Sequence, residues 1–167
     1  MFVLGIDPGL TRCGFGLVEG SLEGDPLAVA VRAGLIETDP CEPVEGRLAQ
    51  LGRDLARLYR ELAPQVVVVE RVFYQRNART AIPVAQASGV AIALAGGARV
   101  RQFTAQEVKL AVTGYGAADK AQVQAMVARL LGLAEVPRPP DVADALALAI
   151  TYLAVARTEA RLPAPAP

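Results

Sequence analysis

Four acidic side chains stand where the sequence could bring them together around divalent metal ions. Asp7 ends the apolar run FVLGID, Glu70 ends the valine run VVVVE, and Asp141 and Asp144 lie three residues apart after the stretch PRPP. Carboxylate oxygens are the ligands that Mg²⁺ and Mn²⁺ prefer in proteins. Two such ions about 3.5–4 Å apart can activate a water and stabilise the attacking and leaving oxygens of a phosphodiester. The acids therefore indicate metal-dependent phosphodiester hydrolysis as one candidate chemistry.

Each of these acids also has a purely structural interpretation. Strands often end on a polar residue such as Glu70, and Asp7 in Asp-Pro-Gly is typical of a turn. Asp141 and Asp144, at the start of an expected helix, could cap free backbone N–H groups and suit the helix dipole. If the acids do converge, their like charges repel one another unless a cation is present. The spacing alone does not choose between capping and metal binding.

The composition removes several other kinds of active site. The 167 residues include no histidine, which excludes Ser-His and Cys-His triads and argues against a zinc site. Cys13 and Cys41 show no metal-binding or redox spacing, and such a pair is typical of a reducing, cytoplasmic compartment. The N-terminus MFVLGID lacks the basic region of a signal peptide. If the chain is a hydrolase, its carboxylates must do the work.

Alternating apolar runs and helical stripes predict the α/β fold that would position the acids. Apolar runs bounded by turn residues indicate strands at 2–7, 13–19, 27–38, 66–69 and 99–103, the first three forming an antiparallel meander. Helical spacing of apolar residues indicates helices at 43–62 and at about 80–94, 104–111, 119–131 and 141–157. This order predicts a mixed five-stranded sheet with helices on both faces. If the first and fourth strands are parallel neighbours, their terminal acids emerge at one edge.

Residues 80–98 could be mistaken for a membrane span, because they carry no charge. Pro83, Gln86 and Ser88 interrupt the apolar character and arginines stand on both sides, so a buried helix of a non-membrane protein is expected. Small residues along one side favour close approach of a second helix, and hence a two-fold symmetric homodimer: Ala85, Gly89, Ile92, Ala93 and Gly96. A single domain over 1–157 and a flexible Pro/Ala-rich tail over 158–167 are expected.

The net charge is zero, but the charges are unevenly distributed along the chain. Residues 1–70 carry six basic and eleven acidic side chains, whereas residues 71–140 carry nine basic and three acidic ones. A basic middle segment is typical of a surface that faces an anion, although a solvated face has the same pattern. Aromatic and basic side chains that could contact nucleic acid follow Glu70: Arg71, Phe73, Tyr74, Arg76 and Arg79. The alternative for the two rings is packing on the following helix.

Lys109 and Lys120 are the only lysines among 17 basic residues, and they flank a loop that contains Gly114 and Gly116. Lysine carries a compact charge on a flexible stem, which suits contact with a phosphate. Chance is the alternative explanation for so small a number. The position of both lysines beside a glycine loop makes them candidates for a phosphate contact.

Four ordered motifs closely resemble the RuvC family of Holliday-junction resolvases, which belongs to the ribonuclease H-like superfamily: GIDPGLTRCGFG, VVVVERVFYQRN, VKLAVTGYGAADKAQV and PPDVADALALAIT. The similarity extends from the first strand to about residue 155. It implies a ribonuclease H-like fold with catalytic acids that bind metal, namely Asp7, Glu70, Asp141 and Asp144. It also implies catalytic lysines in contact with the scissile region, Lys109 and Lys120, and an aromatic contact to DNA at the junction, Phe73.

The expected function is that of a dimeric, metal-dependent endonuclease that nicks two opposed strands of a four-way DNA junction in recombination and repair. The expected metal content is two Mg²⁺ ions per subunit, with Mn²⁺ as a substitute, and the family implies cooperation with the branch-migration motor RuvA–RuvB. Three alternatives stay open. They are a ribonuclease H-like nuclease of structured RNA, a junction-binding protein whose acids only cap, and an ATPase of the sugar-kinase type, which opens with a similar strand and turn.

Overall fold

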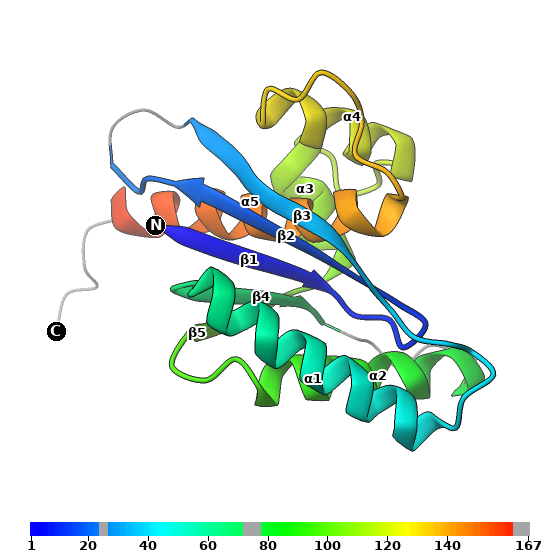
Figure 1. Ribbon diagram of the computed structural model, residues 1–167. Coiled ribbons are helices and arrows are strands. Elements are labelled where there is room, and N and C mark those ends of the chain that lie inside the picture. The colour runs from blue at the N-terminus through cyan, green and yellow to red at the C-terminus, as the bar shows by residue number, and fades with distance from the viewer. Residues whose placement is uncertain (24–26, 72–77, 162–167) are drawn as a thin grey trace, which may run out of the picture.

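The computed structural model describes residues 1–23, 27–71 and 78–161, which form a layered α/β structure (Figure 1). The expected strands and helices are all present in the expected order. In chain order the elements are β1 (Phe2–Asp7), β2 (Arg12–Gly20), β3 (Ala28–Glu37), α1 (Val44–Leu62), β4 (Val66–Glu70), α2 (Ala78–Ala93), β5 (Arg99–Phe103), α3 (Ala105–Thr113), α4 (Lys120–Leu130) and α5 (Pro140–Arg161).

The five strands form one mixed sheet in the order β3-β2-β1-β4-β5. The strands β1, β2 and β3 are antiparallel neighbours, as the meander prediction requires, and β4 and β5 continue the sheet parallel to β1. Ile6 of β1 is paired with Val69 of β4. The next residues, Asp7 and Glu70, therefore leave the sheet at the same end, which confirms the arrangement expected from the sequence.

Helices cover both faces of the sheet, and the valine strand β4 is buried between them (Figure 1). Val66 and Val68 pack into the core that contains α3, α4 and α5, whereas Val67 and Val69 pack into the core that contains α1 and α2. Successive side chains of a strand point to opposite faces of the sheet. A strand with a helical layer on each side must therefore be apolar at every position, which explains the unbroken run of valines.

Helix α5 lies unusually close to the strands because glycines replace side chains under it. A side chain at Gly5 of β1 would overlap the carbonyl oxygen of Ala145, and one at Gly14 of β2 would overlap that of Asp141. A side chain at Gly16 would press against the Leu146 side chain. The glycines of the first two strands thus fix the height at which α5 rests on the sheet.

The main differences from the expected elements are at helix ends. Thr104 and Asp119 cap α3 and α4 from outside through capping boxes with Glu107 and Gln122, although Asp119 was expected inside its helix. Asp119 accepts from a free backbone N–H of the first turn, which favours the cap position. Helix α5 continues beyond its expected end at residue 157 to Arg161, because no glycine or proline interrupts it earlier, so residues 158–161 of the expected tail are helical. Residues 162–167 of that tail lie outside the described residues.

Helix α2 is buried on one side only, so the single chain leaves a side of the helix open on which the predicted second helix could pack. Ala87, Ser88 and Ala91 face the core, whereas Ile82 and Gly89 are exposed. Within the described ranges, no helix combines the length and apolar character that a bilayer crossing needs.

Candidate active site

The start of α5 and the end of β1 meet because of one glycine. Gly14 is the register partner of Asp7, and the backbone of Asp141 lies directly against Gly14. Asp144 follows three residues later and so projects from the same side of the helix as Asp141. The contact at Gly14 therefore places the acids of α5 beside the acid that ends β1.

The Asp7 carboxyl group shows how the four acids converge. Its pKa rises from 3.8 to about 7, first because the group is buried and then because of the negative charges on Asp144, Glu70 and Asp141. The ammonium group of Lys120 acts in the opposite direction. The four acids expected to act together therefore do interact electrostatically at one end of the sheet.

Glu70 is in a similar environment at the end of β4. Burial raises its pKa, the charge on Asp144 raises it further, and the charge on Lys120 lowers it. The parallel pairing of β4 with β1 brings this carboxyl group next to Asp7. Asp7 and Glu70 are partly buried, and neither forms an ion pair with another described residue. Their charged forms are therefore destabilised, and a cation would relieve that cost.

The two acids of α5 are instead paired with basic side chains. The Lys120 ammonium lies 2.6 Å from Asp144 Oδ2, and a guanidinium nitrogen of Arg12 lies 2.8 Å from Asp141 Oδ2. The hydrogen bond to Asp144 raises the pKa of Lys120. Among the described residues, both α5 acids bond to cationic side chains and neither accepts a hydrogen bond from the backbone of its helix, which disfavours the capping interpretation of this pair.

A pocket of about 260 Å³ opens beside the acids. Its charged lining comes from four residues: Glu70, Asp144, Lys109 and Lys120. Its apolar lining comes from α3, α4 and α5, including Val108, Val123 and Leu148. The two lysines that stood out in the sequence therefore reach the same pocket from α3 and α4. A pocket with carboxylates and ammonium groups can hold a cation and an anion side by side.

The donor chemistry of the site fits a hard divalent cation. All four candidate ligands are carboxylates, and the mutual repulsion at Asp7 is what a cation would remove. As the side chains stand, however, the described residues contain no group of three or more acids, thiols or imidazoles set around a single ion. Lys120 and Arg12 each occupy one oxygen of an α5 acid in this arrangement.

Most of the residues expected to contact DNA lie outside the part of the chain that the structure describes. Phe73, Tyr74 and Arg76 lie outside the described residues. Arg79 lies in the first turn of α2, but its side chain is not described. Arg71 is exposed just after β4 and lines another pocket together with β5 residues and Glu107. That pocket does not include the four acids.

Sequence reasoning missed two residues that shape the site. Arg12 pairs with Asp141, and Gly14 admits the helix that carries it. Both lie in the motif GIDPGLTRCGFG, but nothing in their spacing indicates a contact to a residue 129 positions away. The neighbouring Cys13 is buried and its pKa is raised to about 12, mainly by burial, so it is an unreactive core thiol.

Comparison with known proteins identifies the family to which the chain is similar. The family described as "Crossover junction endodeoxyribonuclease RuvC" matches residues 3–152. A protein of that name from Salinispora arenicola is 54% identical, over 99% of this chain and 95% of the relative. RuvC of Thermus thermophilus is 35% identical and superposes with a TM-score of 0.86, over 95% of this chain and 97% of that one.

A second solved structure holds T. thermophilus RuvC in complex with a Holliday junction substrate. It is 34% identical and superposes with a TM-score of 0.84, covering 95% of this chain and 96% of the other. The ribonuclease H-like fold expected from the motifs is thereby confirmed, as is the family resemblance. The chain belongs to the RuvC family of crossover junction endodeoxyribonucleases.

Proposed function

We propose that this chain resolves Holliday junctions by hydrolysing one phosphodiester in each of two opposed strands. Members of its family are crossover junction endodeoxyribonucleases and depend on metal ions. We assign the metal-binding and catalytic role to Asp7, Glu70, Asp141 and Asp144. The observation that carries this assignment is geometric: β1 and β4 end side by side at Asp7 and Glu70, Gly14 sets the backbone of Asp141 against β2, and Asp144 lines one pocket with Glu70.

Two Mg²⁺ ions per subunit are the proposed cofactor, with Mn²⁺ as a substitute. Bound divalent ions would supply positive charge against the negative charge that develops on a phosphodiester during hydrolysis. The acids would hold them through oxygen atoms, as hard cations require. Because Lys120 now occupies Asp144, we propose that its ammonium leaves that carboxylate when the site is loaded.

The displaced lysine has a second partner available in the same pocket. Lys109 and Lys120 both line it, next to Glu70 and Asp144. A phosphodiester bound there would accept hydrogen bonds from the ammonium groups, which carry three donors each. We therefore propose that the two lysines bind the phosphate at the scissile position while the acids hold the metal.

The function also requires two sites, and helix α2 offers the surface for a homodimer. Ile82, Ala85, Gly89 and Ala93 recur at helical spacing along its exposed side. A side chain at Gly89 would meet no atom of its own chain within 4 Å, so a partner helix could approach there. A two-fold axis through this surface would present two equivalent sites to the four-way junction.

The dimer can be tested at Ile82, whose side chain is 57% exposed. Ile82→Glu is expected to give a folded monomer by analytical ultracentrifugation, because it places a charge in the apolar surface. Leu110→Glu on α3 is the matched control, since Leu110 is also 57% exposed. A dimer of Ile82→Glu as tight as wild type would reject α2 as the interface. Cooperation with the motor RuvA–RuvB is proposed from family membership alone.

The direct test of the function is cleavage of a synthetic mobile four-way junction. We expect paired nicks in opposed strands with Mg²⁺ or Mn²⁺, none with a chelator, and none in a linear duplex of the same sequence. Cutting of structured RNA in place of the junction would favour the RNA-processing alternative.

A junction-binding protein without catalysis is the second candidate, with the α5 acids neutralised by ion pairs in place of the capping role first expected for it. In such a protein Arg12 and Lys120 would neutralise the acids permanently. Asp141→Asn separates the candidates. In a nuclease, the variant loses nicking but still binds the junction. In a protein that only binds junctions, neither wild type nor the variant nicks the DNA.

A further inference from the structure

Arg12 occupies a special position at the entrance of the site. It is the first residue of β2, and a terminal guanidinium nitrogen lies 2.8 Å from Asp141 Oδ2. The Arg12 side chain is 48% exposed, against 22% for Asp141. Arginine has five N–H donors in a planar fork. Within the described part of the chain, Asp141 is the acceptor to which this guanidinium donates, so its remaining donors face solvent.

The turn that carries Arg12 is held firmly in place. A side chain at Gly9 would overlap the backbone carbonyl of Arg12, so the turn between β1 and β2 is tight. Thr38 donates its backbone N–H to the carbonyl of Thr11, and Arg47 of α1 donates to the hydroxyl groups of both threonines. These bonds fix the backbone beside Arg12 relative to Thr38 and α1, and Gly14, two residues further along β2, lies against the Asp141 backbone of α5. The reach of Arg12 to Asp141 is therefore a property of the fold.

The ion pair leaves one oxygen of Asp141 uncommitted. Arg12 takes Oδ2, and the charge of Asp141 acts on the carboxyl group of Asp7. Carboxylates that bind metals are commonly oriented by a hydrogen bond to their second oxygen, and removing that partner typically costs 10–100-fold in metal affinity or activity. Arg12 is placed to orient Asp141 in this way.

We propose that Arg12 is a positioning residue that holds Asp141 for metal binding and, with its outward N–H groups, binds a backbone phosphate of the junction. The inference rests on the proposed nuclease function. A guanidinium can serve a carboxylate and a phosphate at once because its donors point in different directions. Arg12 thereby couples the arrival of DNA to the orientation of a metal ligand.

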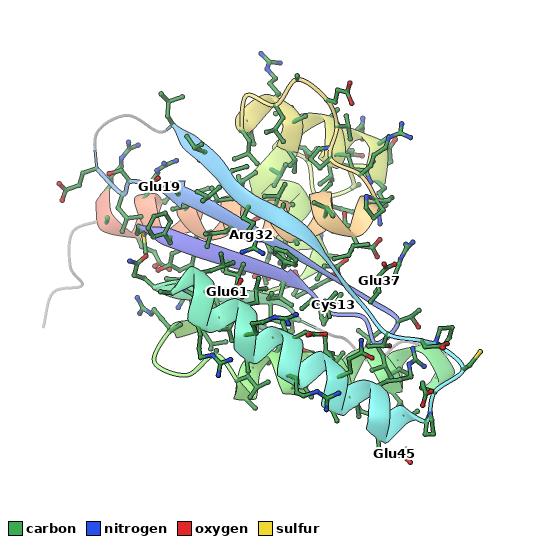
Figure 2. All side chains as sticks on the ribbon, viewed as in Figure 1. Cys13, Glu19, Arg32, Glu37, Glu45 and Glu61 are labelled. Carbon is green, nitrogen blue, oxygen red and sulfur yellow. The ribbon has the colours of Figure 1, made fainter. Side chains whose placement is uncertain are left out.

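Three variants test the proposal. Arg12→Gln removes the positive charge. Arg12→Lys keeps the charge but loses the planar arrangement of N–H donors of the guanidinium group. The matched control is Arg32→Gln, because Arg32 of β3 also forms an exposed ion pair, 3.1 Å from Glu61 of α1, on the same sheet (Figure 2). Circular dichroism of each variant checks that the protein is folded.

The first measurement is Mn²⁺ binding to the DNA-free protein by titration calorimetry. We expect Arg12→Gln to weaken binding about tenfold or more and Arg32→Gln to leave it unchanged. The second is junction affinity against salt concentration without nicking, in Ca²⁺. There we expect Arg12→Gln to reduce the slope of log affinity against log salt by about one and Arg12→Lys to restore the slope but not the Mn²⁺ affinity.

Wild-type Mn²⁺ affinity in Arg12→Gln would overturn the proposal, as would tighter binding, which would mean that the guanidinium competes with the metal. An unchanged salt slope would overturn the phosphate contact and so the proposal. Failure of the nuclease function itself looks different, because wild-type protein would then bind no Mn²⁺ and cut no junction. If wild type cuts while Arg12→Gln behaves like Arg32→Gln, the inference about Arg12 alone is wrong.

Discussion

Helices α1 and α5 cover opposite faces of one sheet, but they pack against it in different ways. Helix α1 packs through a stripe of leucine side chains, of which Leu51, Leu55 and Leu58 are buried. Helix α5 packs with its backbone close to β1 and β2, at Gly5 and Gly14. Side-chain packing can relax when one residue changes, whereas a backbone contact cannot. Both faces therefore contribute to stability, but the α5 face also determines where the four acids lie.

The same contrast holds for the acids of the two helices. Asp54 of α1 pairs with Arg57 one turn away on the surface, at 2.9 Å. Asp144 of α5 pairs with Lys120 of another helix, inside the pocket. An exposed pair within one helix contributes a few tenths of a kcal/mol to stability. The pair in the pocket joins α4 to α5 beside Glu70, so a substitution of Asp144 tests the proposed function rather than surface stability.

The largest expected effect is that of Asp144→Asn on cleavage. Metal-ion catalysis supplies several kcal/mol of transition-state stabilisation, so we expect the cleavage rate to fall on the order of a thousandfold. Junction affinity should be unchanged or higher, because a negative charge near the DNA is lost. Single-turnover cleavage and gel-shift binding measure the two. Asp54→Asn is the control and should cut like wild type. Equal cutting rates for the two variants would contradict a functional difference between the acid of α1 and the acid of α5.

Leu55→Ala tests the α1 face, where the side chain is fully buried. Truncating a buried leucine typically costs about 2–5 kcal/mol in the free energy of unfolding. We expect that loss in urea denaturation, together with a cleavage rate per folded molecule close to wild type at low temperature. A large loss of cleavage in fully folded Leu55→Ala protein would show that α1 also positions the acids.

Gly14→Ala and Gly46→Ala compare the two faces at glycine positions. An alanine at Gly14 would overlap the backbone of Asp141, whereas one at Gly46 of α1 has open space within 4 Å. We expect Gly14→Ala to destabilise the protein by about 1–3 kcal/mol and to lower cleavage at least tenfold. Gly46→Ala should stabilise by up to about 1 kcal/mol. Thermal unfolding and cleavage rates check both, and wild-type activity of Gly14→Ala would contradict the account.

The smallest effect concerns pH and Asp7 in the metal-free protein. The pKa of Asp7 is about 7 in the folded protein against 3.8 ordinarily, so the folded state binds its proton more tightly. Stability from this group is present below pH 4 and is lost as pH rises to about 7. Asp7→Asn should therefore raise the free energy of unfolding at pH 8, by roughly 1–3 kcal/mol in chelator. A lower free energy of unfolding for Asp7→Asn than for wild type at pH 8 would contradict repulsion between Asp7 and the other acids.

Much of this arrangement could be predicted from local sequence patterns. The run VVVVE predicted a strand covered on both faces, and turn residues predicted the meander that pairs β1 with β2. The parallel pairing of β1 with β4 followed as a condition for Asp7 and Glu70 to meet, and it is present. These features depend on periodicity and turn chemistry, which are local properties of the chain.

The contacts between distant residues could not be predicted in the same way. The ion pair of Arg12 with Asp141 spans 129 positions and depends on how closely α5 approaches β2. Gly14 permits that approach, but a glycine in a strand also suits a bulge or a bend. The sequence of α2 left open how much of the helix the chain itself covers, because an uncharged helix is equally suited to a core and to an interface between subunits.

Anomalous diffraction from Mn²⁺-soaked crystals tests the central claim most directly. We expect density bonded to carboxylate oxygens of Asp7 and Asp144 at roughly 2.0–2.3 Å, with the Lys120 ammonium displaced from Asp144. Crystals with no anomalous density among Asp7, Glu70, Asp141 and Asp144, and with Lys120 still on Asp144 at saturating Mn²⁺, would contradict the assignment of these acids as metal ligands.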